Sequence, residues 1–113
     1  MAHFCRAKKI INLHRGGMAD CQAGMLDSAA FKLKMALTEV RKIGLKCYQV
    51  KILNNLGIVF ELMGNRQEAR KHYQAALGAA GLKLGKETKL YQVVKRNLNR
   101  VSQPPLPTSP DIS

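Results

Sequence analysis

The chain repeats itself with a period of 40 residues, and this self-similarity limits its possible folds more than any other feature. The aligned pairs include Leu13 with Leu53, Gly17 with Gly57, Gly24 with Gly64, Ala29 with Ala69, Ala36 with Ala76 and Leu37 with Leu77. Each unit contains two apolar stretches joined at a glycine, and such a unit cannot bury its apolar face without a neighbour stacked upon it. The repeat therefore predicts a stack of similar units.

The position of the prolines indicates what each unit is made of. All prolines fall after Gln103, so the strongest helix breaker is absent from the rest of the chain; they are Pro104, Pro105, Pro107 and Pro110. Aliphatic residues recur at helical spacing, as in Leu53, Leu56 and Val59, and no useful period-two alternation occurs. We therefore expect an all-α protein, a short α-solenoid of helical hairpins.

Glycines divide the chain into segments that are each long enough for a helix. We predict helices at residues 3–22, 26–43, 46–63, 66–81 and 87–102. Asn65 precedes one of these segments, with Glu68 three residues later, which is typical of a capped helix start. We expect one helical domain at residues 1–102 and a proline-rich disordered tail at residues 103–113.

The second copy of the repeat resembles the tetratricopeptide repeat. The residues that carry the resemblance are Leu53, Leu56, Gly57, Phe60, Gly64, Ala69, Tyr73 and Ala76. The resemblance covers about residues 10–83 and implies two antiparallel helices that cross at Gly57 and Ala69, with Phe60 and Tyr73 filling the gap beside them. The period of 40 exceeds the usual 34 and is similar to that of the longer-repeat members of the family, such as kinesin light chains and some bacterial regulators.

The other two copies depart from this pattern. In the first copy, Asp20 stands where Phe60 stands in the second. A third copy consists of one helix, residues 87–102, and its register is ambiguous between shifts of 42 and 43 residues. Such a helix would cap the solenoid, with two repeats before it and a polar outer side supplied by Lys89, Arg96 and Arg100.

Charge is the strongest compositional signal. Hydrophobic residues make up 46% and charged residues 23%, as in an ordinary globular protein, but 19 Lys and Arg against 7 Asp and Glu give a formal net charge of +12. Such a surface attracts nucleic acid, an anionic membrane or an acidic protein. No apolar run approaches the roughly 18 residues of a membrane span, and the opening residues are charged, so we expect a soluble cytoplasmic chain.

Catalytic and metal-binding patterns are weak. The histidines have no paired carboxylate nearby, and the constellation of nucleophile, base and orienting residue is missing, so we expect no enzyme and no cofactor. Three cysteines without CxxC spacing argue against a disulfide framework and a structural zinc site. We expect them to be reduced core residues. The spacing of His3, Cys5 and His14 is too irregular for a tetrahedral site, so no metal is expected.

A basic helical nucleic-acid-binding module is the alternative function that the charge leaves open. Lysine and arginine are spread over every predicted helix, and three Phe, three Tyr and no Trp offer few rings to stack on bases. No known nucleic-acid motif is present. Membrane association is not expected, because the amphipathic faces are needed to pack the solenoid.

The tetratricopeptide resemblance implies a binding groove. In that family the first helix of each hairpin lines a concave surface that holds an extended peptide or a partner helix. The matching positions are His14, Arg15 and Met18 in the first copy, Lys51, Asn54, Asn55, Ile58 and Leu62 in the second, and Lys95 on the last helix. Asn55 stands where family members hydrogen-bond peptide backbone, although asparagine is also common there without a ligand. His14 and Met18 replace the Lys and Asn of the carboxylate clamp, so a true clamp is not expected.

These observations predict a protein-protein interaction adaptor or scaffold. We expect its basic groove to bind an acidic or carboxylate-bearing segment of another protein. Because about three repeats are needed for a stable solenoid, self-association could complete the stack. The residues expected at the open ends are Ile10, Ile11 and Leu13 on the first helix and Val94, Leu98 and Val101 on the last.

Overall fold

The computed structural model describes residues 2–104, and their side chains except those of residues 2–4 and 83. Within this part the helices are joined by short turns and loops and no strand is present, which confirms the all-α prediction. The helices are α1 (Ala2–Gln22), α2 (Leu26–Ile43), α3 (Lys46–Leu62), α4 (Arg66–Lys83) and α5 (Lys89–Ser102). The tail predicted to be disordered spans residues 103–113, and residues 105–113 of it lie outside the described part.

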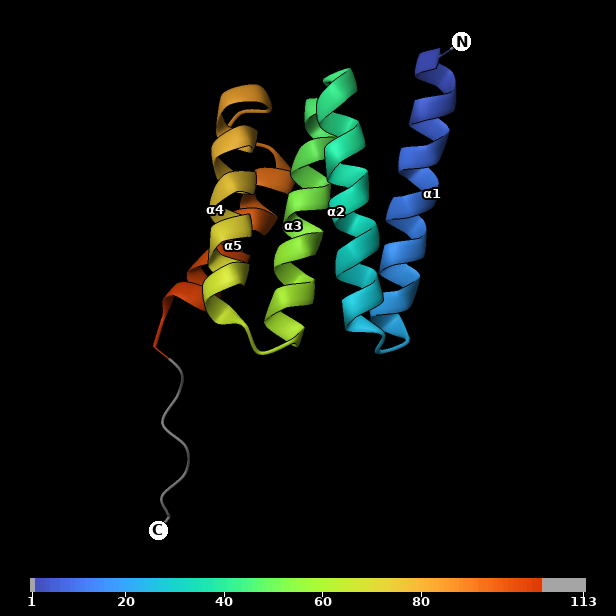
Figure 1. The fold of residues 1–113 in the computed structure, drawn as a ribbon. Coiled ribbons are helices and arrows are strands. Elements are labelled where there is room, and N and C mark those ends of the chain that lie inside the picture. The colour runs from blue at the N-terminus through green and yellow to red at the C-terminus, as the bar shows by residue number, and fades with distance from the viewer. Residues whose placement is uncertain (1, 105–113) are drawn as a thin grey trace.

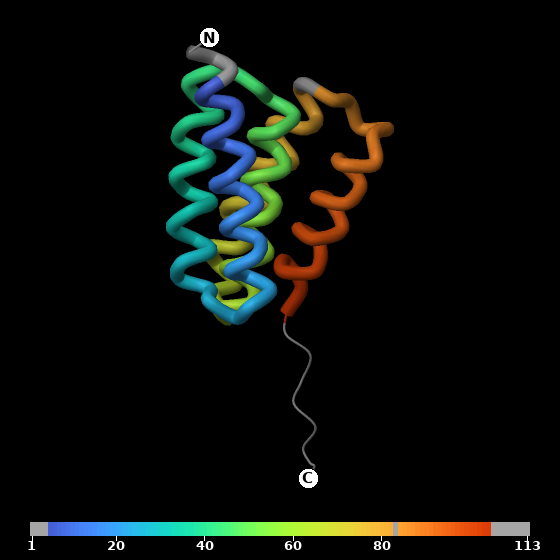
Figure 2. Tube along the Cα trace, turned by 90° about the vertical axis from the view of Figure 1, so that its right-hand side faces the viewer, coloured from blue at the N-terminus to red at the C-terminus, as the bar shows by residue number. Residues whose placement is uncertain are grey.

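The helices form a short α-solenoid of two hairpins followed by a single helix. Each helix packs against the next along the chain, and weaker contacts join α1 to α3 and α3 to α5. Figure 1 shows the helices standing side by side, with α1 at one edge of the row and α4 and α5 at the other. In the turned view of Figure 2, α2 and α5 lie on opposite sides of α1. The first helices of successive units are α1, α3 and α5, and because they contact one another in this order they share one side of the stack.

Both hairpins turn in the same way. Gly24 and Gly64, which are 40 residues apart, each have a φ of 81°, in the left-handed region that glycine adopts without steric cost. The following backbone amide donates to a carbonyl five residues earlier in both turns, Met25 to Asp20 at 2.8 Å and Asn65 to Phe60 at 2.9 Å. In the second hairpin Asn65 also caps α4, since its side chain accepts a hydrogen bond from the Glu68 amide.

The close contact expected at Gly57 in the second hairpin is present, and the first hairpin has an equivalent contact at Gly17. A Cβ atom on Gly57 would lie 2.4 Å from Cε1 of Tyr73, so the tyrosine ring rests directly on the glycine backbone. In the first hairpin a Cβ atom on Gly17 would lie 2.9 Å from Cγ of Leu33. Both glycines are buried and let the paired helices approach at the middle of the hairpin.

Asp20 explains how the first hairpin tolerates its departure from the repeat. Its carboxylate accepts a hydrogen bond from Ser28 at 2.5 Å and forms an ion pair with Lys32 at 2.8 Å. These contacts hold the pKa of Asp20 below its usual value, chiefly through Lys32. In the second hairpin the equivalent positions are Phe60 and His72, whose rings stack with centroids 5.0 Å apart. An ion pair and a ring stack thus fill the same place in the two units.

Burial corrects two of the sequence-based expectations. Three residues expected at open ends are inside the molecule, with exposures of 1%, 0% and 5% for Ile10, Val94 and Val101. They contribute to the continuous core, so they are not available for self-association. All three cysteines are free, as expected, but Cys5 and Cys47 are exposed rather than buried.

The predicted helix bounds hold to within a few residues, and the largest differences flank the last loop. Helix α4 continues to Lys83, past the predicted end at Gly81, and the left-handed residue that follows it is Gly85. Helix α5 begins at Lys89 because the Thr88 side chain caps it by accepting a hydrogen bond from the Tyr91 amide. None of the described helices is long and apolar enough to cross a membrane.

Candidate functional site: the surface of the first helices

A hydrogen-bonded group joins α1 to α3 on this surface. His14 Nδ1 lies 3.1 Å from the Tyr48 hydroxyl, and Asn55 Nδ2 lies 2.6 Å from His14 Nε2. In this orientation of the Asn55 amide its nitrogen donates to Nε2, which corresponds to the tautomer with the ring proton on Nδ1, facing the Tyr48 oxygen. The two rings meet edge to face, with centroids 5.2 Å apart. We call His14, Tyr48 and Asn55 the His14 cluster.

Two cations surround the His14 cluster. Lys51 on α3 and Arg15 on α1 are both exposed. Burial lowers the pKa of His14, and the positive charge of Lys51 lowers it further. Burial raises the pKa of Tyr48, and Arg15 acts in the opposite direction on the same hydroxyl. The cluster is therefore a neutral, partly buried polar site in a positive field.

The structure brings four of the predicted groove residues together here: His14, Arg15, Lys51 and Asn55. Met18 and Ile58 are partly buried and pack against the core. Leu62, at the last position of α3, is 60% exposed. The predicted groove thus has a polar, positive centre on α1 and α3, with apolar side chains along the same helices.

Asn54 and Lys95 have other surroundings. Asn54 is buried, and its Oδ1 accepts a hydrogen bond from Asn97 of α5 at 2.9 Å. Lys95 is exposed and lies two residues before Asn97, which places it about 160° around α5 from the side that faces α3. The structure therefore does not bring Lys95 together with Lys51 and Arg15.

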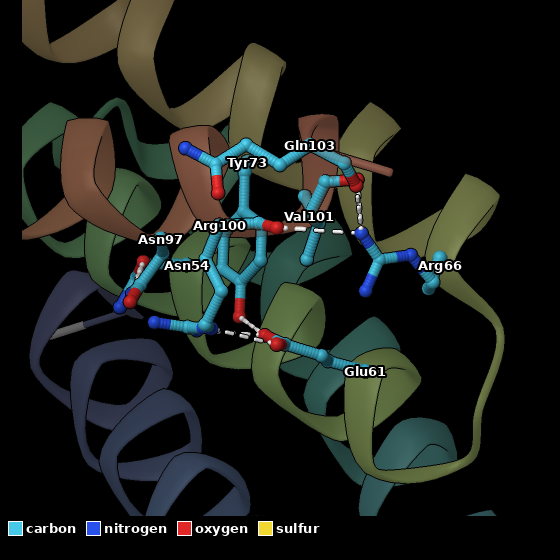
Figure 3. A network of polar contacts seen from close by, with 8 residues as sticks. All are labelled: Asn54, Glu61, Arg66, Tyr73, Asn97, Arg100, Val101 and Gln103. Carbon is cyan, nitrogen blue, oxygen red and sulfur yellow. Dashed lines mark hydrogen bonds and ion pairs between the residues drawn. The ribbon is translucent and has the colours of Figure 1, made fainter. Parts of the chain in front are cut away.

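Helix α5 is held in place by a charged network at the end of α3. Glu61 accepts hydrogen bonds from Arg100 Nε and Nη2, both at 2.7 Å, and from the Tyr73 hydroxyl at 2.9 Å (Figure 3). Arg100 lowers the pKa of Glu61, whereas burial and the Glu61 carboxylate raise the pKa of Tyr73. One carboxylate thus ties together α3, α4 and α5.

Arg66 satisfies the free carbonyl groups at the end of α5. Its Nη2 donates to the backbone oxygens of Arg100, Val101 and Gln103, as Figure 3 shows. The last carbonyls of a helix have no partner within the helix, so this arginine supplies one. Sequence reasoning did not identify Arg66, Glu61 or Tyr48 as positioning residues, because their partners lie 34 to 39 residues away in the chain.

Four of the six described carboxylates are paired with other cations. Among the described residues, the ion pairs join Asp20 to Lys32, Glu39 to Lys42, Glu68 to Lys71 and Glu61 to Arg100. No described carboxylate pairs with Arg15 or Lys51. The described side chains also include no group of three or more His, Cys, Asp or Glu residues that could hold a metal ion.

Comparison with known proteins identifies no relative: no family model, curated protein or solved structure matches the chain. The tetratricopeptide resemblance therefore rests on the residues of the second repeat.

Proposed function

We propose that this protein is a tetratricopeptide-like adaptor that binds an acidic, extended segment of another protein on the surface of its first helices. The observation that carries the proposal is the His14 cluster with its two cations. Arg15 and Lys51 lie beside the cluster, and no described carboxylate neutralises them. A carboxylate supplied by a partner would complete this site.

Two kinds of contact would hold the segment. Arg15 and Lys51 would bind carboxylates through charge-assisted hydrogen bonds, each contributing about 1.5 to 3 kcal/mol when partly desolvated. Asn55 would keep its amide nitrogen on His14, while its Oδ1, for which the described residues supply no partner, would accept a backbone N–H of the segment. The cations would select acidic sequence, and Asn55 would favour an extended backbone.

Nucleic-acid binding is the competing function, and the net charge of +12 supports it. The positions of the aromatic side chains argue against base stacking. Tyr73 and Phe60 are buried, and Tyr48 is engaged with His14. Phe31 is 65% exposed, but it lies on α2, outside the surface of the first helices.

A binding titration with defined probes tests the proposal. The probes are a fluorescent peptide of about ten residues, rich in Glu and Asp, and a single-stranded oligonucleotide of equal charge. We expect Lys51→Glu to weaken peptide binding by about tenfold or more, which corresponds to about 1.4 kcal/mol. The Asn55→Ala variant should also weaken peptide binding, because it removes the Oδ1 atom that would accept a hydrogen bond from the peptide backbone.

The matched control is Lys71→Glu, on α4. Lys71 is an exposed lysine that pairs only with Glu68 at 3.2 Å among the described residues, and its reversal should leave peptide binding nearly unchanged. Circular dichroism of each variant verifies that the helices are intact. Equal losses from Lys51→Glu and Lys71→Glu, with tighter binding of the oligonucleotide and no effect of Asn55→Ala, would reject the adaptor in favour of nucleic-acid binding.

A further inference from the structure

A second surface, separate from the His14 cluster, lies between α4 and α5. A hollow of about 460 Å³ opens there, and its lining is mostly apolar. The side contributed by α4 contains Leu77, Gly78, Gly81 and Leu82, and the side contributed by α5 contains Tyr91 and Leu98. We call this hollow the α4–α5 groove.

The α4–α5 groove lies where the solenoid would place its next helix. Helices α1 and α3 each pack against the second helix of their own hairpin, α2 and α4. Helix α5 packs against α4 of the preceding hairpin, and the described residues contain no second helix of its own. Asn97 of α5 contacts α3, and Leu98 lies about 100° further around the helix, on the side that a second helix of a third hairpin would cover. The four prolines of the sequence lie between residues 104 and 110, and proline does not fit the interior of a helix.

The floor of the groove contains a glycine, Gly78, that no contact within the described residues requires. A Cβ atom on Gly78 would meet nothing within 4 Å, although glycine inside a helix costs about 1 kcal/mol relative to alanine. Leu82 is 86% exposed at the same groove. A helix without a side chain at this point lets another backbone approach closely.

Charge decides which kind of helix fits. Lys86 lines the groove and is exposed, and no carboxylate is among the lining residues. Two further exposed cations lie one helical turn from lining residues: Lys95 follows Tyr91 by four residues on α5, and Arg70 precedes Gln74 by four residues on α4. A second copy of this chain is a poor occupant, because each of its five helices carries more Lys and Arg than Asp and Glu. A complementary helix would present leucine-like side chains to the floor and carboxylates to the rim.

We propose that the α4–α5 groove docks an acidic amphipathic helix of another protein, which takes the place of the second helix of a third hairpin. This site is independent of the surface around His14. It recognises a helix rather than an extended segment.

The test uses a synthetic helical peptide of about 18 residues, with leucines on one face and glutamates on the other. A control peptide has the same composition in scrambled order, so that its charge is equal but its apolar face is lost. Fluorescence anisotropy measures both against the full chain. We expect the amphipathic peptide to bind at least about tenfold more tightly than the scrambled one.

Two pairs of variants locate the binding site. Gly78→Leu adds a side chain to the groove at a position where a Cβ atom would meet nothing within 4 Å, and it should weaken binding by about tenfold or more. Thr38→Leu, the same position in the first hairpin, should not. Lys95→Glu should weaken binding, and Lys51→Glu, beside the His14 cluster, should not. Thermal unfolding verifies that each variant is folded.

Each remaining outcome overturns the proposal. Equal binding of the two peptides would show diffuse charge attraction, and no binding of either would show that the groove takes no such helix. Loss with Lys51→Glu but not with Lys95→Glu would assign the peptide to the surface of the first helices. A dimer in light scattering that Gly78→Leu abolishes would show that a second copy is the occupant.

Discussion

Glycine has opposite roles at different positions of this chain. Gly57 is required because the Tyr73 ring occupies the space of any side chain, whereas Gly78 faces open space. Gly57→Ala should therefore lower the free energy of unfolding by about 1 to 3 kcal/mol through overpacking. Urea unfolding followed by circular dichroism measures this change.

The control is Gly78→Ala, which adds the same methyl group. It should raise the free energy of unfolding by about 0.5 to 1 kcal/mol, because alanine is the better helix former. If Gly57→Ala were as stable as the unmodified protein, the close crossing of α3 and α4 would be incorrect.

The pKa of His14 makes stability depend on pH. Burial and Lys51 lower this pKa from its ordinary value of 6.5 in the folded state, so the unfolded chain binds the proton more readily. The contribution of neutral His14 is therefore complete above pH 6.5 and is lost as the pH falls toward the folded pKa. Urea unfolding at several pH values should show this decrease.

A histidine variant assigns the effect. His14→Gln should remove most of the decrease between about pH 7 and pH 5, because the group whose pKa the fold lowers is then absent. An unchanged pH profile in His14→Gln would mean that His14 is not held neutral by the fold.

At the scale of the elements, the attachment of α5 depends on a few polar contacts. Glu61 binds Arg100 of α5 and Tyr73 of α4 at once. Glu61→Ala should cost about 1 to 3 kcal/mol, because the hydroxyl of the buried Tyr73 loses its acceptor and Arg100 loses its partner. In this variant, amide hydrogen exchange should be faster in α5 than in α2, because α5 has lost contacts that hold it to the stack.

The matched control is Glu68→Ala, which removes an exposed ion pair with Lys71. It should cost less than about 0.5 kcal/mol. A double-mutant cycle between Glu61→Ala and Arg100→Ala should give a coupling energy of about 1 kcal/mol. Zero coupling would mean that Glu61 does not hold α5 through Arg100.

The elements themselves were predictable, because glycines and helical spacing are local signals. For the helices at the ends of the stack, the sequence did not predict which side faces the neighbouring helices. Lys95 was expected in the groove while the register of the third unit was ambiguous by one residue, and one residue rotates a helix by about 100°. The contacts of His14 with Tyr48 and Asn55 likewise depend on how α1 sits against α3.

The sequence also did not show how the structure accommodates a residue that departs from the repeat. Asp20 breaks the apolar pattern, and only the packed structure shows that Ser28 and Lys32 satisfy it. Compensation between a residue on one helix and its partner on the next leaves no local signal. The repeat therefore predicted the fold well and the polar contacts poorly.

At the scale of the whole molecule, charge opposes folding. A net charge of +12 on a chain of 113 residues produces self-repulsion that the four ion pairs of the described part do not cancel. Raising NaCl from about 0.1 M to 1 M shortens the screening length from about 10 Å to 3 Å. Tm should then rise by about 4 °C or more, and a fall in Tm would mean that the ion pairs outweigh the repulsion.

The adaptor function is tested most directly by amide NMR, with the acidic extended peptide titrated into the full chain. Binding at the His14 cluster predicts shifts that saturate at His14, Arg15, Lys51 and Asn55, with little change on the outer faces of α2 and α4. Shifts spread over all five helices in proportion to their lysines and arginines would contradict the proposed site. That pattern would leave this protein as a diffuse polyanion binder.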